Sequence, residues 1–115
     1  MKRTVTYNSV FQIQRALHKL YDSGAKFRVD AAVNLTKVMC DVDELADAIT
    51  DQLVEAIPGL KDMEYAMNES ERELYSAILS SAVEIDNRDV DLGGMSMDDA
   101  ARIDLKTANI LLSIF

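Results

Sequence analysis

Residues 30–57 read DAAVNLTKVMCDVDELADAITDQLVEAI, and this stretch decides the fold. Its apolar side chains recur at steps of three and four residues, which is the period of an α-helix and close to a heptad seam. These positions are Ala31, Leu35, Val38, Val42, Leu45, Ile49, Leu53 and Ile57. The opposite face carries carboxylates with no cation among them, here named the acidic row: Glu44, Asp47, Asp51 and Glu55. The stretch predicts one amphipathic helix that packs by one stripe and presents a negative face.

The segment before it predicts a strand and a shorter helix. Residues Arg3–Tyr7 alternate and contain β-branched side chains, which favours a short strand. Asn8 or Ser9 can then cap a helix that runs to about Ser23 and stops at Gly24. The predicted inward face of this helix consists of Val10, Ile13, Ala16, Leu17, Leu20 and Tyr21.

A short link, residues 24–29, joins these two helices, so we expect them to be antiparallel neighbours in a helical hairpin. Asp30 is the predicted N-cap of the long helix, where its charge suits the positive end of the helix dipole. Leu45 should be buried between the two helices.

The segment after residue 57 predicts a third helix. Pro58 and Gly59 end the long helix, because proline lacks the amide donor and glycine tolerates left-handed geometry. A further short helical turn can follow at Leu60, Met63 and Met67. Asn68 and Glu71 have the spacing of a capping box. The apolar set of the helix that follows is Leu74, Tyr75, Ile78 and Leu79.

The period changes after Ala82. Residues 83–85 and 90–92 each alternate, and the segment between them can turn, so the pattern predicts a small β-hairpin. Gly93-Gly94 is the predicted hinge.

Ser96 and Asp99 form a second capping-box pattern, which opens a helical stretch that ends in the mainly apolar residues 110–115. The predicted fold is therefore mainly α, of the α+β class: a helical hairpin plus third and C-terminal helices with a small β-hairpin.

Composition indicates one folded domain over residues 1–115, with 49% hydrophobic and 28% charged residues. The net charge of −8 is uneven, because residues 1–28 contain six cations and one acid and so carry +5, while the remainder carries −13. This net negative charge disfavours direct binding of nucleic acid, because contacts to phosphates need clustered Lys and Arg. The basic segment can instead neutralise the acidic row, either within the chain or on a second copy.

Cysteine usage and hydropathy bear on location. Cys40 is alone, so an internal disulfide is excluded and a reducing compartment is favoured. No cationic segment leads into an apolar run, and no stretch of about 18 apolar residues occurs. The expected location is the cytoplasm, or the host cytoplasm if the gene is viral, with no membrane association.

Catalytic patterns are missing from the sequence. His18 has no cysteine ligand or nucleophile near it, and Cys40 is expected to be a small buried hydrophobic residue. Asp86, Asp89 and Asp91 favour an ordinary acidic turn, because they do not fit the spacing of a calcium loop. No glycine-rich phosphate loop occurs either. We therefore predict a protein that is not an enzyme and that has no cofactor and no metal site.

The acidic row has two interpretations. Three successive like-charged pairs, three or four residues apart, cost roughly 1 kcal/mol of helix stability. The row is either a solvated face that maintains solubility or a surface for a basic partner. Met63 and Met95, in or beside connecting segments, are further candidates for partner binding or else fill gaps, because flexible thioethers adapt to varied surfaces.

The layout resembles small uncharacterised proteins of tailed phages, with an extended start, a helix, a long helix, a strand-like stretch and an apolar end. The run Thr6-Tyr7-Asn8-Ser9-Val10-Phe11 is similar to the opening of podophage DNA-mimicking antirestriction proteins. These likenesses imply a small interaction protein that binds a host protein, such as a basic nucleic-acid-binding one, and inhibits or redirects it. The alternative is a structural component of a virion or tail-assembly complex that acts by self-association, and a homo-oligomer is compatible with either.

Overall fold

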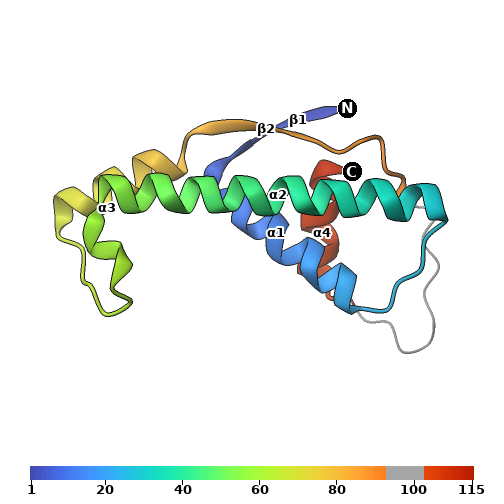
Figure 1. Ribbon diagram of the computed structural model, residues 1–115, viewed down its shortest axis with the longest axis horizontal. Coiled ribbons are helices and arrows are strands. Elements are labelled where there is room, and N and C mark those ends of the chain that lie inside the picture. Colours follow the sequence, from blue (N-terminus) through green and yellow to red (C-terminus); the bar gives the residue numbers. More distant parts are fainter. Residues whose placement is uncertain (93–102) are drawn as a thin grey trace.

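The computed structural model describes residues 1–92 and 103–115 and has a mainly helical α+β fold (Figure 1). The elements in chain order are β1 Lys2–Thr6, α1 Tyr7–Asp22, α2 Val29–Ala56, the 3-10 helix η1 Pro58–Lys61, α3 Glu69–Leu79, β2 Ala82–Asp86 and α4 Leu105–Ile114. The predicted fold class is confirmed: a helical hairpin, a third and a C-terminal helix, and a small two-stranded antiparallel sheet.

Helix α2 is the long axis of the molecule. Its 28 residues span about 42 Å at 1.5 Å per residue, against a longest molecular dimension of 47 Å, and Figure 1 shows the other elements arranged along it. Arg28 occupies the N-cap position, and Asp30 lies in the first turn, so the prediction of Asp30 as the cap is wrong by two residues. The helix ends at Ala56, before Pro58 opens η1.

The core lies where α1 crosses α2 and where β2 and α4 close over them. Among the described residues, thirteen buried hydrophobic ones form one cluster: Val10, Ile13, Ala16, Leu17 and Leu20 of α1, Val38, Val42, Ala46, Ile49 and Leu53 of α2, Ile85 of β2, and Leu111 and Ile114 of α4. The predicted inward face of α1 is confirmed except at Tyr21, which is 73% exposed.

Leu45 departs from its predicted place. It is half-buried rather than buried between α1 and α2, and it lines a groove that α2 shares with β2. Ala46 takes the buried position in this turn, so the buried stripe follows 38, 42, 46, 49 and 53. The reason is that α2 has neighbours on two sides, and Leu45 turns toward the sheet.

The sheet pairs distant parts of the chain. Strand β1 runs antiparallel to β2, in a register that places Lys2 opposite Asp86 and Thr6 opposite Ala82. The predicted hairpin between 83–85 and 90–92 is therefore wrong in its pairing: the first segment is a strand, but its partner is the N-terminal strand, and 90–92 is not a strand.

Caps explain where the helices begin. Thr6 caps α1, its Oγ1 accepting from the Ser9 amide at 3.2 Å, so the helix starts just before the predicted Asn8 or Ser9 cap. The predicted capping box of α3 is confirmed, with the Glu71 amide donating to Asn68 Oδ1 at 2.8 Å and the Asn68 amide donating to Glu71 Oε1 at 3.1 Å.

The terminal helix α4 is capped by Asp104, whose carboxylate accepts from the Thr107 amide. The predicted hinge at Gly93-Gly94 and the predicted capping box at Ser96 and Asp99 lie outside the described residues. Helix α3 has no fully buried residue: Tyr75, Ile78 and Leu79 are half-buried against the core, and Leu74 is exposed.

Candidate functional site

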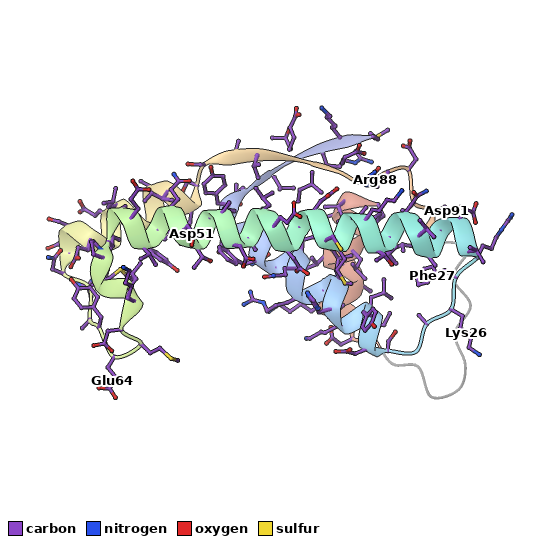
Figure 2. The ribbon with its side chains drawn as sticks, in the orientation of Figure 1. Lys26, Phe27, Asp51, Glu64, Arg88 and Asp91 are labelled. Atoms are coloured by element: carbon purple, nitrogen blue, oxygen red, sulfur yellow. The ribbon has the colours of Figure 1, made fainter. Side chains whose placement is uncertain are left out.

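The acidic row lies on the exposed side of α2. All four side chains are exposed, and none has a hydrogen bond or ion pair with any other described residue; Figure 2 labels Asp51 as one of them. Three of the six cations of the basic N-terminal segment form ion pairs elsewhere: Lys2 with Glu84, Lys19 with Asp104, and Arg28 with Asp30. Within the described residues, the chain therefore does not neutralise its own acidic row.

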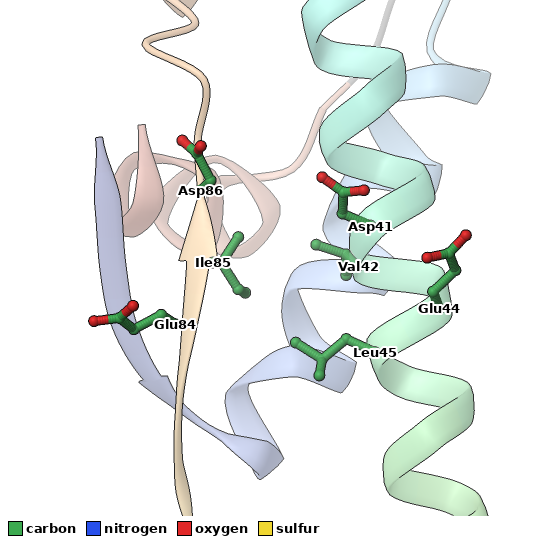
Figure 3. Close-up of a pocket in the computed structure, with 7 residues that line it drawn as sticks. All are labelled: Asp41, Val42, Glu44, Leu45, Glu84, Ile85 and Asp86. Atoms are coloured by element: carbon green, nitrogen blue, oxygen red, sulfur yellow. The ribbon is translucent and has the colours of Figure 1, made fainter.

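A groove of about 410 Å³ separates α2 from β2 (Figure 3). It is here named the α2–β2 groove, and its lining is Asp41, Val42, Glu44, Leu45, Glu84, Ile85 and Asp86. The aliphatic residues of the lining are buried or half-buried, whereas the four carboxylates are exposed. Because Glu44 belongs both to the groove and to the acidic row, the two form one continuous acidic surface.

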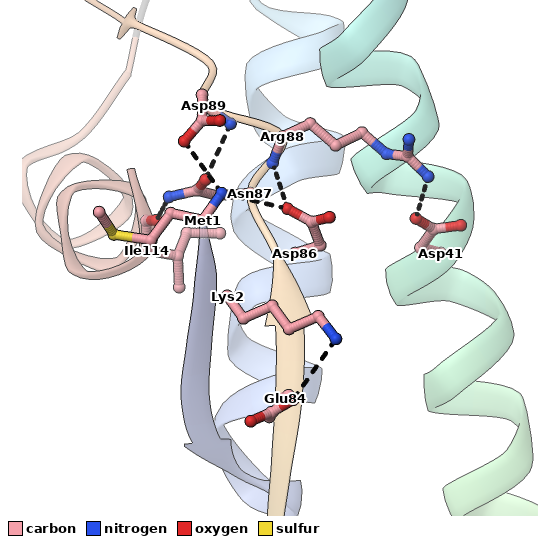
Figure 4. A network of polar contacts seen from close by, with 9 residues as sticks. All are labelled: Met1, Lys2, Asp41, Glu84, Asp86, Asn87, Arg88, Asp89 and Ile114. Atoms are coloured by element: carbon pink, nitrogen blue, oxygen red, sulfur yellow. Dashed lines mark hydrogen bonds and ion pairs between the residues drawn. The ribbon is translucent and has the colours of Figure 1, made fainter.

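The guanidinium of Arg88 lies at one end of the α2–β2 groove (Figure 4). Arg88 and Asp89 adopt left-handed backbone conformations, with φ of 51° and 54°. Such conformations cost an L-residue about 1–2 kcal/mol each. From this turn, Arg88 Nη2 donates to Asp41 Oδ2 at 2.9 Å. The Arg88 amide donates to Asp86 Oδ1 at 2.9 Å, and this bond is the main reason that the pKa of Asp86 lies below its ordinary value.

Asn87 fixes the turn that carries Arg88. Its side-chain amide donates to the Ile114 carbonyl at 2.7 Å, and its backbone amide donates to the Met1 carbonyl at 3.0 Å (Figure 4). Its Oδ1 accepts from the Asp89 amide at 2.9 Å. The Met1 ammonium lies 2.9 Å from Asp89 Oδ1, and this hydrogen bond raises the pKa of the amine. The end of β2 is thus joined to both β1 and α4, which holds the groove wall in place.

A polar contact joins the two helices of the hairpin. His18 Nε2 lies 2.9 Å from Asp43 Oδ1, and Gln14 Nε2 donates to the same oxygen at 2.9 Å. Burial raises the pKa of Asp43, but the bonds from Gln14 and His18 together lower it by more, so the pKa ends below its ordinary value. This contact ties α1 to α2.

Cys40 is exposed, and the prediction of a buried residue is wrong. It lies two positions from both Val38 and Val42, which are buried. Two residues correspond to about 200° around a helix, so Cys40 faces away from the core.

The remaining predicted partner-binding residues are the two methionines. Met63 is fully exposed and follows η1, at the end of α2 beyond Glu55. Met95 lies outside the described residues. Over residues 1–92 and 103–115, no three His, Cys, Asp or Glu side chains are grouped so that they could hold a metal ion.

Sequence reasoning missed four residues of the groove and its end: Asp41, Glu84, Asp86 and Arg88. It places Asp86 only in an acidic turn. The signal was available for Asp41, which is one turn before Glu44 on the same predicted helix, but the β2 residues join it only through a long-range strand pairing.

A second groove, of about 550 Å³, lies beside β1. It is here named the β1 groove, and the described residues that line it are Thr4, Val5, Thr6, Ser9, Gln12, Ile13, Asn109, Ile110 and Ser113. None of these side chains is charged, which sets this groove apart from the α2–β2 groove.

Within the described part of the chain, no helix is both long and apolar enough to cross a bilayer.

Comparison with known proteins found no relative of this chain. No protein-family model, no curated protein and no solved structure matches this chain.

Proposed function

We propose that this chain is a protein-binding protein that recognises a basic surface on one partner through the acidic row and the α2–β2 groove. The observation that carries the proposal is the continuity of the two: exposed carboxylates without a partner among the described residues lead along α2 into a groove with an apolar floor. A partner side chain with an aliphatic stem and a cationic head matches both parts, since lysine and arginine stems pack on apolar surface while their charges stay at the rim.

Repulsion between the carboxylates of the acidic row also favours the binding of a basic partner to α2. The acidic row costs roughly 1 kcal/mol through repulsion between successive carboxylates, and Asp51 and Glu55 also approach the negative end of the helix dipole. A basic partner would remove this repulsion on binding. The same charges would accelerate its association by electrostatic steering.

The partner class follows from charge. Nucleic acid would be repelled by this face, because its phosphates bind cations, whereas a nucleic-acid-binding protein presents the complementary basic surface. The layout's resemblance to phage accessory proteins adds the host-directed form of the proposal: the chain binds a host protein and inhibits or redirects it, without catalysis of its own.

The test is affinity capture from a lysate of the source or host cell, compared between two variants. The first, here named the row variant, removes the acidic row by Glu44→Gln, Asp47→Asn, Asp51→Asn and Glu55→Gln. The matched control removes the same charge elsewhere, at residues that are also exposed and unpaired among the described residues: Asp22→Asn, Glu64→Gln, Glu69→Gln and Glu73→Gln.

We expect a basic protein to be retained by the native chain and by the control but lost from the row variant. With the purified partner, the association rate of the native chain should fall steeply as salt is raised. Binding by the row variant with an unchanged rate and affinity would mean that the row is only a solvated face.

A further inference from the structure

The outer edge of β1 presents backbone groups that have no partner among residues 1–92 and 103–115. The Asn87 amide bonds to the Met1 carbonyl and the Tyr7 amide bonds to the Ser81 carbonyl, so the odd-numbered residues of β1 carry the hydrogen bonds of the ladder. Hydrogen-bonded and non-bonded pairs alternate in an antiparallel ladder. Lys2, Thr4 and Thr6 therefore direct their amides away from β2, and all three residues are exposed.

The arrangement of this edge is self-complementary. We propose that two copies of the chain pair through β1, antiparallel about a two-fold axis at Thr4, to form a four-stranded sheet. In this register the two Thr4 residues exchange two backbone hydrogen bonds, and each Thr6 amide donates to the carbonyl of Lys2 in the second copy. Thr4 is the centre of Lys2–Thr6, and an axis at Thr4 passes through a hydrogen-bonded pair of the new ladder and uses the outward amides of all three outward-facing residues.

Side chains in this register are compatible across the interface. Threonine stands opposite threonine at the axis, and lysine stands opposite threonine on either side. Threonine pairs are favourable cross-strand neighbours, whereas like charges directly opposite one another are destabilising. The edge of β2 fails this criterion: its outward-facing residues are Ala82, Glu84 and Asp86, so the same symmetry would place Glu84 opposite Glu84. Charged residues on the β2 edge disfavour pairing with a strand of another chain, whereas the centre of the β1 edge carries no charge.

The surroundings of β1 also suit a second copy. Two bodies of net charge −8 repel each other, so a contact between them is favoured at a surface without acids. The β1 groove meets this requirement, because its described lining from β1, α1 and α4 contains no charged side chain. Figure 3 shows β2 between β1 and α2, so the outer edge of β1 faces away from α2 and the two α2–β2 grooves remain open in the dimer.

The first test is Thr4→Lys, measured by size-exclusion chromatography with light scattering over a dilution series. The substitution places two lysines opposite each other at the axis, and within the chain it faces Glu84, so the fold is retained. The matched control, Ala82→Lys, adds the same charge to the other strand. We expect the native chain and the control to be dimers and Thr4→Lys to be a monomer, with unfolding midpoints showing that both variants are folded.

The second test reads the register and does not depend on the first. Cys40→Ser provides a background without thiols, into which Thr4→Cys or Lys2→Cys is introduced. In the Thr4→Cys dimer, the Cα atoms of the two introduced cysteines would lie about 5.5 Å apart, within disulfide range. In the Lys2→Cys dimer, the two introduced cysteines would be separated by four residues of strand, about 14 Å. Mild oxidation should cross-link the first variant and leave the second uncross-linked.

A native chain that is monomeric at all concentrations would overturn the proposal, as would a dimer that Thr4→Lys leaves intact. Equal cross-linking of both cysteine variants would overturn the register. These outcomes do not involve the acidic row, so failure here leaves the proposed partner surface untouched.

Discussion

The side chain of Asn87 joins the end of β2 to α4 through its bond to the Ile114 carbonyl. Replacing Asn87 with Ala would leave the Ile114 carbonyl without its buried donor. An unsatisfied buried group costs about 1–3 kcal/mol, so we expect Asn87→Ala to lower the free energy of unfolding by this amount in urea denaturation followed by circular dichroism. Asn109→Ala, at an exposed position of α4, is the control and should change little. Equal effects of the two substitutions would contradict the assigned role of Asn87.

Asp43 gives the pH dependence expected at the residue scale. Its pKa is lower in the folded protein than its ordinary value of 3.8. A lowered pKa adds stability that is fully present above the unfolded value and is lost as the pH falls through the folded value. The native chain should therefore be more stable than Asp43→Asn at neutral pH, and the difference should close below about pH 4. Denaturation midpoints across this range measure it, and a gap that persists in acid would refute the assignment.

At the scale of elements, α2 distinguishes a buried side from a groove side. Ile49→Ala, at a buried position, should cost about 2–5 kcal/mol through lost transfer energy and a cavity. Leu45→Ala should cost only about 1–2 kcal/mol, because Leu45 is half-buried at the groove. Chemical denaturation of the two variants tests the difference, and equal costs would mean that Leu45 belongs to the helix interface after all.

The helices were predictable from the sequence because their signals are local. The spacing of Val38, Val42 and Ile49, and the pair Asn68 and Glu71, act within a few residues of one another. The sheet was not predictable in its pairing, because nothing near residues 83–85 indicates that their partner is the first strand. The same limit hid the α2–β2 groove, since its two walls meet only through that pairing. The prediction that Cys40 is buried failed for another reason. It relied on the usual burial of cysteine, although the position of Cys40 on the helix directs it away from the core.

At the scale of the whole molecule, the charge imbalance should appear in stability. The row variant removes four charges from a body of −8 and about 1 kcal/mol of repulsion within α2. We expect it to melt at or above the temperature of the native chain in low salt, and the difference should shrink as salt screens the repulsion. Thermal unfolding at two ionic strengths measures both effects. A row variant that melts well below the native chain would show that the carboxylates have partners that stabilise the fold.

The order of the sheet in the chain has a consequence for biosynthesis. Strand β1 leaves the ribosome before the other described elements, yet the residue opposite Lys2 is Asp86, which follows about 80 residues later. Protein synthesis proceeds at about 5–20 residues per second, so several seconds pass before β2 is available to pair with β1. During this time α1 and α2 can already form their hairpin. During that interval both edges of the nascent strand are open. On a crowded polysome, neighbouring nascent chains present the same strand to one another before either has closed its own sheet.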